Sequence, residues 1–208
     1  MIAIIDYGMG NLHSVENALH HLNAACIITN QAAQIQQADK LILPGVGAFP
    51  DCMKHLEELG LLPVLQEEVL QKKKPLLGIC LGMQALFEDS YEGTYTKGLG
   101  FLQGSIVKMQ DPNVKIPHIG WNLLEPMQKA SVFDKLSQAP FVYYVHSYYA
   151  QNYRPEDILG YSSYGSLKIP GLVRKDNILG AQFHPEKSGE DGLNILRCLL
   201  YTSPSPRD

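Results

Sequence analysis

The sequence predicts an α/β fold in which helices flank a mostly parallel central sheet, with antiparallel hairpins in the second half of the chain. In the first half, short apolar runs alternate with amphipathic segments, which is the order expected of strand–helix–strand units. After about residue 100 the pattern changes to strand-like segments separated by Gly, Pro and Asn turns. Because crossover connections are right-handed, the strands of the first half should form one parallel sheet.

Four short apolar runs of the first half are predicted strands: 2–5, 25–29, 41–44 and 76–79. The segments between them repeat apolar residues at helical spacing and predict three helices: 11–22, 51–59 and 63–73. The strand-like segments of the second half are 105–109, 141–150, 159–165, 171–175 and 178–183. A last helix is predicted from about 190 to 200.

Length and composition predict one domain over residues 1–200. The chain has 208 residues, of which 45% are hydrophobic and 18% charged, enough to bury a sizeable core. Its net charge of -4 gives no general electrostatic reason to bind nucleic acid. No run approaches the roughly 20 apolar residues of a membrane span, and the first residues lack the basic start and the length of a signal peptide. We therefore expect a cytoplasmic protein without nucleic-acid or membrane partners.

The final segment 201–208, YTSPSPRD, does not fit the pattern of the domain. Its two prolines cannot continue the predicted last helix. The string from Cys198 onward also resembles a translated sequencing-library adapter. We therefore expect a non-native or disordered tail in place of the natural C-terminus.

The four cysteines are scattered and form no C-x-x-C pair: Cys26, Cys52, Cys80 and Cys198. This pattern argues against a disulfide framework and against a thiolate metal site. Three histidines on predicted helices lie away from any carboxylate cluster: His20, His21 and His55. We therefore expect free thiols, at most one of them reactive, and neither a metal nor a cofactor.

One cysteine lies in the sequence Gly78-Ile79-Cys80-Leu81-Gly82, between a predicted strand and a helical pattern. This spacing is typical of the sharp turn that presents a nucleophile at the end of a strand, where glycines relieve crowding. A helix N-terminus also stabilises a thiolate. The alternative is a buried structural cysteine whose neighbouring glycines serve packing.

A second motif, AQFHPEKSG, places His184 and Glu186 two residues apart after a predicted strand. In extended backbone both side chains leave the same face, so a Cys–His–Glu triad becomes possible. His184 would take or share the Cys80 proton, and Glu186 would orient the imidazole. The alternative is a turn histidine at a strand end beside a solvated glutamate.

A third motif, LILPGVGAFPD, could supply the backbone donors of an oxyanion hole. Small residues follow a predicted strand and let main-chain N–H groups approach a substrate: Gly45, Val46 and Gly47. The N–H of Leu81, directly after the cysteine, would be a second donor. Judged alone, the motif also fits a Gly/Pro turn before a helix that Asp51 caps. All three motifs follow strand ends, where open α/β sheets bind ligands.

The motifs LPGVGAF, GICLGMQ and FHPEKS resemble those of the class I, triad-type glutamine amidotransferases. Three more are similar to motifs of the glutaminase subunits of imidazole glycerol phosphate synthase, in histidine biosynthesis: DYGMGNLHS at 6–14, PHIGWN at 117–122 and YYVHSYY at 143–149. The resemblance covers nearly the whole chain apart from the tail. It implies a flavodoxin-like architecture.

The resemblance also implies a reaction. Cys80 would attack the side-chain amide of L-glutamine and form a glutamyl thioester, and His184, oriented by Glu186, would protonate the departing ammonia and then activate water. The residues expected to bind the substrate are Gln84, Glu92 and the main chain of His146, Ser147 and Tyr148.

A partner is implied as well, a cyclase subunit with a (β/α)₈ barrel, which would use the ammonia to make imidazole glycerol phosphate and an aminoimidazole carboxamide ribotide. The expected interface residues are Asn11, Trp121 and Lys187. The alternatives are a helix cap for Asn11, a core anchor for Trp121 and a solvated turn for Lys187. Val46 is β-branched and resists the positive φ angles that glycine accepts. We hypothesise that the resting loop presents a carbonyl to the site and that partner binding turns the peptide.

Three other functions are alternatives at this point. A cysteine hydrolase or thiol-sensing protein of the same architecture would lack a glutamine pocket, and Gln84 argues against it. A non-catalytic binding subunit would not need Cys80, His184 and Glu186 together. The glutaminase of another synthase, such as one making pyridoxal phosphate or anthranilate, would differ in its partner.

Overall fold

A computed structural model describes residues 1–201, with side chains through residue 198. Among these residues the largest sheet has eight strands, in the order β2-β1-β3-β4-β14-β13-β12-β9. Five of them are parallel: β2 (Cys26–Thr29), β1 (Ile2–Ile5), β3 (Lys40–Leu43), β4 (Leu76–Ile79) and β14 (Ile178–Ala181). Three antiparallel strands extend the sheet at one edge: β13 (Leu167–Lys175), β12 (Ile158–Tyr164) and β9 (Glu125–Pro126).

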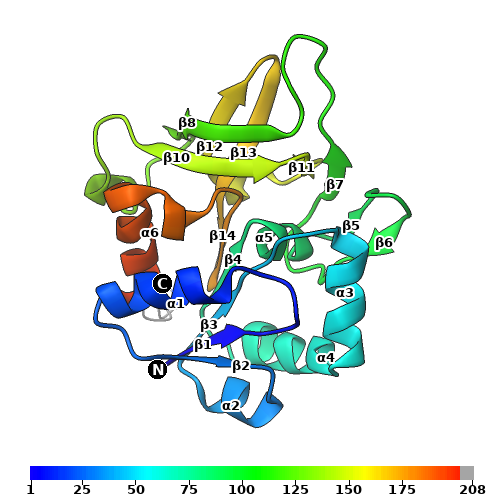
Figure 1. Ribbon diagram of the computed structural model, residues 1–208, viewed down its shortest axis with the longest axis vertical. Coiled ribbons are helices and arrows are strands. Elements are labelled where there is room, and N and C mark those ends of the chain that lie inside the picture. The colour runs from blue at the N-terminus through cyan, green and yellow to red at the C-terminus, as the bar shows by residue number, and fades with distance from the viewer. Residues whose placement is uncertain (202–208) are drawn as a thin grey trace.

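Helices cover both faces of the parallel strands (Figure 1). One face packs against α1 (Leu12–His21) and α6 (Gly189–Tyr201). The other packs against α2 (Ala32–Gln37), α3 (Phe49–Glu58), α4 (Leu61–Leu65) with its π-helical continuation η1 (Gln66–Gln71), and α5 (Leu81–Ala85).

Side chains alternate along each parallel strand between these two helical layers. Ile2 and Ile4 of β1 belong to the cluster that contains Leu19 of α1, while Ala3 and Ile5 belong to the cluster that contains Phe49 of α3. Strands buried on both faces read as continuous apolar runs, which is why the sequence predicts them well. Each fully buried Leu or Ile stabilises the fold by about 1.5–3 kcal/mol.

Two smaller sheets complete the fold. In the first, β10 (Phe141–His146) pairs antiparallel with β8 (His118–Leu123). The second contains β11 (Tyr148–Gln151), β7 (Ser105–Lys108), β5 (Asp89–Ser90) and β6 (Thr96–Lys97). β8 and β10 lie across β12 and β13 (Figure 1), and buried residues of β10, β12 and β13 share a core. Short 3₁₀ turns lie at η2 (Phe133–Lys135), η3 (Pro155–Asp157) and η4 (Pro185–Lys187).

The predicted fold class is confirmed, but several elements differ from expectation, and strand β8 is not among the predicted strands. Helix α2 was not predicted, because Ile35 is its only buried residue and the sequence therefore shows no repeat of apolar residues at helical spacing. The strand predicted over 141–150 breaks at Ser147, so that β10 and β11 join different sheets. Helix α3 begins at Phe49 after Ala48, so Asp51 lies in its first turn and is not its cap.

Tyr201, the first residue of the predicted tail, is the last residue of α6. The remainder of that tail, 202–208, lies outside the described residues. Within the described part of the chain, no helix combines the length and apolar character that crossing a membrane requires.

Candidate active site

Cys80 lies at the sharp turn between β4 and α5. Its backbone has φ 53° and ψ -111°, a conformation that residues other than glycine rarely adopt. The N–H of Cys80 donates to Ala181 O at 2.7 Å, so the turn is tied to the neighbouring strand β14. Such strain at a strand-to-helix turn presents a nucleophile to a ligand.

The glycines on either side of Cys80 permit close approach of main-chain atoms. A Cβ on Gly82 would lie 1.8 Å from Leu43 O, and a Cβ on Gly78 would lie 2.7 Å from Gly82 O. Neither position accepts a side chain unless the backbone moves. The glycines therefore serve packing of α5 against β3 and β4, while the strained φ belongs to Cys80 itself.

His184 and Glu186 lie in the turn that follows β14. The N–H of His184 donates to Tyr143 O at 2.9 Å, and its carbonyl accepts the Ser188 hydroxyl at 2.6 Å. The extended backbone that we expected here is a 3₁₀ turn, η4, and this turn brings Glu186 Oε1 within 2.8 Å of His184 Nδ1. The side chains of this pair are 2% and 1% exposed.

The imidazole of His184 interacts with both Cys80 and Glu186. Burial alone lowers the pKa of His184, but hydrogen bonding with Cys80 and Glu186, and their negative charges, raise it to about 10. Nδ1 of His184 is hydrogen-bonded to Glu186, whereas its buried Nε2 has no hydrogen-bond partner of normal geometry among the described residues. Nε2 is therefore the nitrogen available to exchange a proton with the thiol. The arrangement brings a thiol, an imidazole and a carboxylate together in the order that nucleophilic catalysis uses.

The Gly45–Gly47 loop presents a carbonyl to the turn at Cys80. Gly45 O accepts a hydrogen bond from Leu81 N–H at 3.3 Å, so the donor expected to bind an oxyanion is already occupied. Val46 is 43% exposed, and its φ lies in the ordinary negative range. This geometry agrees with the resting loop hypothesised from the sequence.

Three of the residues expected to bind substrate share hydrogen bonds close to Cys80. Gln84 Nε2 donates to Tyr148 O and to Gln182 Oε1, each at 3.0 Å. His146 Nδ1 lies 2.8 Å from the same Tyr148 oxygen. The carbonyl of Ser147, between them in the chain, accepts from Met109 N–H at 2.9 Å and anchors the segment to the loop after β7.

Glu92 approaches the site from the segment after β5. Its Oε2 accepts the N–H of Phe49 at 2.9 Å, so this carboxylate caps α3, the helix that begins directly after the Gly45–Gly47 loop. Burial raises the pKa of Glu92, and the hydrogen bond from Phe49 opposes this change. The sequence did not predict this capping contact, because the two residues lie far apart in the chain.

Two buried polar residues of the site were missed by sequence reasoning. Gln182 is fully buried, and its Nε2 lies 3.9 Å from Cys80 Sγ. His118 is 2% exposed, and its Nδ1 lies 3.0 Å from His146 Nε2. The available signal was a polar residue inside an apolar strand, as in ILGAQF, because a buried polar group requires a hydrogen-bond partner.

The three residues expected at a partner interface lie on the surface. Trp121 is 56% exposed, Lys187 is exposed and Asn11 is half-exposed. Asn11 occupies the N-cap position of α1, as the alternative of a helix cap expected, but its side chain makes no capping hydrogen bond. Trp121 belongs to an apolar row on the β8–β10 sheet, in which the other exposed members are Ile119, Phe141 and Val145.

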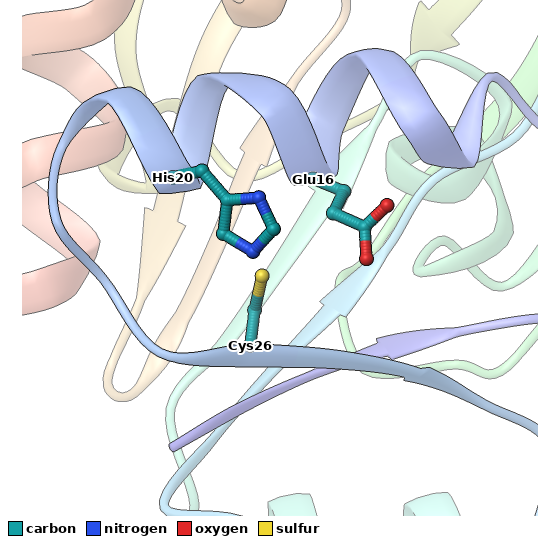
Figure 2. Close-up of side chains that lie close together, drawn as sticks. All are labelled: Glu16, His20 and Cys26. Carbon is teal, nitrogen blue, oxygen red and sulfur yellow. The ribbon is translucent and has the colours of Figure 1, made fainter.

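One group of metal-ligand side chains comes together among the described residues, away from Cys80. Glu16 and His20 of α1 and Cys26 of β2 point toward one another, with ligand atoms within 4.8 Å (Figure 2). Cys26 pairs with Ile2 at the amino-terminal edge of the parallel strands, whereas Cys80 follows the carboxyl end of β4. Burial, and then the Glu16 carboxylate, raise the pKa of Cys26 and favour the neutral thiol over the thiolate that binds metals.

Comparison with known proteins identifies the class. The family model for class-I glutamine amidotransferases matches residues 3–200. A solved structure of a glutamine amidotransferase has a TM-score of 0.76 and 19% identity, over 96% of this chain and 97% of its own. The structure of PurLQS from Thermotoga maritima has a TM-score of 0.70 and 17% identity, over 96% of both chains. Fold and family model together define a class-I glutamine amidotransferase.

Curated relatives identify the family within that class. The chain is 52% identical over 197 residues to the imidazole glycerol phosphate synthase subunit HisH of Oceanobacillus iheyensis, covering 95% of this chain and 96% of that subunit. It is 54% identical over 198 residues to the HisH subunit of Bacillus cereus, covering 95% and 92%. The chain belongs to the family of imidazole glycerol phosphate synthase HisH subunits, as the sequence motifs predicted.

Proposed function

We propose that the chain is the glutaminase subunit of an imidazole glycerol phosphate synthase and hydrolyses L-glutamine to L-glutamate and ammonia. The observation that carries the proposal is the strained Cys80 beside a buried imidazole that Glu186 holds by Nδ1. A thiol, an imidazole and a carboxylate in this order are the groups that acyl transfer from an amide uses.

Cys80 is the nucleophile of this reaction. Its thiolate attacks the side-chain carboxamide carbon of glutamine, while the protonated His184 holds the proton that the leaving group needs. As the C–N bond breaks, Nε2 gives this proton to nitrogen, and ammonia leaves from a glutamyl thioester. Glu186 keeps the proton on Nδ1 in place, so that Nε2 alone exchanges its proton.

Water releases the glutamate in the second step. The neutral His184 accepts a proton from water as the water oxygen attacks the thioester carbon. The C–S bond breaks, and the thiolate beside the imidazolium is restored. The side chain leaves as a carboxylic acid and releases its proton to solvent. Glutamine and water have become glutamate, ammonia and one proton, so atoms and charges balance.

Both steps place negative charge on the carbonyl oxygen of the substrate, which preorganised N–H groups stabilise. Leu81 N–H and Val46 N–H are the proposed donors. Because Gly45 O holds Leu81 N–H at rest, the Gly45–Val46 peptide must turn before the hole is complete. The resting subunit is therefore slow, and binding of the partner supplies the turn.

Glutamine lies against the main chain of His146, Ser147 and Tyr148 with its amino acid end, and Gln84 contacts it. Glu92 is the proposed partner of the substrate ammonium, because it is a half-buried carboxylate and its side chain already contacts the start of α3. Gly47 belongs to the loop that enters this helix.

The ammonia passes to a cyclase subunit with a (β/α)₈ barrel, which makes imidazole glycerol phosphate and aminoimidazole carboxamide ribotide. The apolar row on β8 and β10 supports a protein partner, since exposed apolar patches mark such surfaces. Asn11 and Lys187 add polar contacts, and Lys187 directly follows Glu186 near the exit of ammonia. Both subunits act in the cytoplasm.

The test is glutamate release by the purified chain, with and without the cyclase and its ligand. We expect turnover to require the cyclase and to disappear in Cys80→Ala. Cys26→Ala is the matched control, because this cysteine lies at the opposite edge of the sheet, and it should retain activity. Activity on peptides or peroxides but not on glutamine would refute the proposal.

A further inference from the structure

A continuous chain of hydrogen bonds connects the exposed strand β8 with the thiol of the active site. Its members in order are Asn122, His118, His146, the main-chain oxygen of Tyr148, Gln84, Gln182 and Cys80. The successive distances are 3.4, 3.0, 2.8, 3.0, 3.0 and 3.9 Å. The two imidazoles at its centre are buried, with 2% and 7% of their surface exposed.

The two ends of the histidine segment determine where its protons lie. Tyr148 O can only accept, so His146 donates from Nδ1 and is left to accept at Nε2. His118 therefore donates from its own Nδ1 to that Nε2. At the other end, the Asn122 amide nitrogen can only donate, so His118 accepts at Nε2. Both rings are neutral with the proton on Nδ1, since any other state leaves two donors or two acceptors facing each other.

The orientation of Asn122 is established independently of the histidines. Its Nδ2 also donates to Ser163 O at 2.9 Å, and its Oδ1 accepts Leu123 N–H at 2.8 Å. These two contacts exclude the flipped amide, because flipping would set Oδ1 against a carbonyl and Nδ2 against an N–H. The polarity of the chain is therefore imposed by main-chain groups at both ends.

Packing holds the histidine pair in place. The ring of His118 is stacked between Tyr144 and Tyr164, with centroids 4.6 and 4.0 Å away. Burial lowers the pKa of His118 to about 4; burial also lowers the pKa of His146, to about 3, although its hydrogen bond to Tyr148 opposes this. Both rings thus remain neutral near pH 7, and all four ring nitrogens have partners. A buried polar network in which every group is hydrogen-bonded fixes one geometry more strictly than apolar side chains in the same place would.

We propose that His118 and His146 are positioning residues of the glutamine pocket: as a neutral pair of fixed polarity they hold the Tyr148 carbonyl, and through it the amide of Gln84. This role rests on the proposed glutaminase function, because Tyr148 and Gln84 belong to the pocket assigned to the substrate. Neither histidine exchanges a proton with the substrate. Disturbing the pair should weaken glutamine binding and leave the chemistry at Cys80 largely intact.

The proton positions can be tested without any activity. In the chain labelled with ¹⁵N-histidine, long-range proton–nitrogen spectra at pH 7 should show the Nδ1–H form for both rings, assigned by the signals lost in His118→Phe and His146→Asn. An Nε2–H form or a protonated ring at either residue overturns the proposal, whatever the protein does with glutamine. Absence of glutaminase turnover together with both Nδ1–H signals would instead refute the proposed function alone.

Kinetics of the complex with the cyclase subunit test the role itself. His118→Phe keeps an aromatic ring between the two tyrosines but removes both nitrogens. We expect KM for glutamine to rise about tenfold, the effect of losing one buried hydrogen bond, with kcat changed by less than about twofold. His118→Asn, which retains a donor near the Nδ1 position, should recover part of the loss.

Tyr144→Phe is the matched control. It removes a fully buried hydroxyl that is hydrogen-bonded to Ser162 at 2.8 Å and stacked on the same imidazole, but lies outside the chain. Its KM should stay at the unsubstituted value. Equal KM changes in Tyr144→Phe and His118→Phe, or a loss confined to kcat, would show that the histidine only fills space.

Discussion

Replacing Val46 with glycine should raise the glutaminase rate of the free subunit. At rest, Gly45 O accepts the Leu81 N–H at 3.3 Å. Turning the Gly45–Val46 peptide would replace this carbonyl with the Val46 N–H, and it would also reverse the sign of φ at Val46. That φ lies in the negative range now, so the turned state places a β-branched residue at positive φ.

The size of the effect follows from this conformational cost. A side chain with a Cβ at positive φ costs about 1–2 kcal/mol, which glycine avoids. The glycine variant should therefore populate the turned peptide about 5- to 30-fold more. Val46 is 43% exposed, so the substitution removes little packing.

The assay is glutamate release by the free subunit, measured beside the cyclase complex. We expect the rate of the free Val46→Gly subunit to rise about 5- to 30-fold. Activation by the cyclase should shrink by the same factor, because the loop in the complex is already turned and the rate of the complex should not change. Val46→Ala is the control, since it loses the branch but keeps the Cβ, and it should gain less. An unchanged free rate, or equal gains for alanine and glycine, would refute the argument that φ at residue 46 limits the turn.

Three further predictions concern the elbow, the histidine and the exposed face. Gly82→Ala should cost about 3 kcal/mol or more in urea unfolding, because its Cβ would lie 1.8 Å from Leu43 O. Gly60→Ala, with φ +66° and nothing within 4 Å, should cost only about 1–2 kcal/mol; equal losses would contradict this account. The raised pKa of His184 contributes folding stability that is fully present below about pH 6.5 and is lost as the pH rises through about 10. Cys80→Ala should lower the pKa of His184 in an NMR titration, because the negative charge of Cys80 is one cause of the raised value. An unchanged pKa would count against the interaction between Cys80 and His184. Trp121→Ala should weaken cyclase binding, measured by calorimetry, by about tenfold or more. Met127→Ala should not weaken it, because Met127 is exposed but lies outside the apolar row. Similar affinities for both variants would exclude the β8–β10 face as the interface.

The parallel strands were predictable because burial on both faces leaves an unbroken apolar run in the sequence. β1 and β4 have the predicted bounds, 2–5 and 76–79. Helix α2 was not predicted because its one buried residue, Ile35, gives no repeat of apolar residues at helical spacing. The break at Ser147 was not predicted either, because the segments on both sides of it favour strand. They differ only in the strands with which they pair in the folded structure.

Within the site, the motifs located Cys80, His184 and Glu186, because each follows the end of a strand and carries a distinctive local pattern. The 3₁₀ turn that joins His184 to Glu186 was not foreseen, since Pro185 is compatible with both the extended chain and the turn. The contact of Glu92 with Phe49 and the burial of Gln182 beside the thiol depend on residues distant in the chain.

The sequence by itself determined the elements of the parallel sheet, the cysteine turn and the identity of the reacting side chains, because periodicity and short motifs are local properties of the chain. Only the tertiary structure decided that the Gly45 carbonyl accepts the Leu81 N–H, that Gln182 faces the thiol, and that His118 and His146 form a buried hydrogen-bonded pair. These features depend on the direction of each donor and acceptor across strands, and hydrogen-bond direction is set by packing in three dimensions.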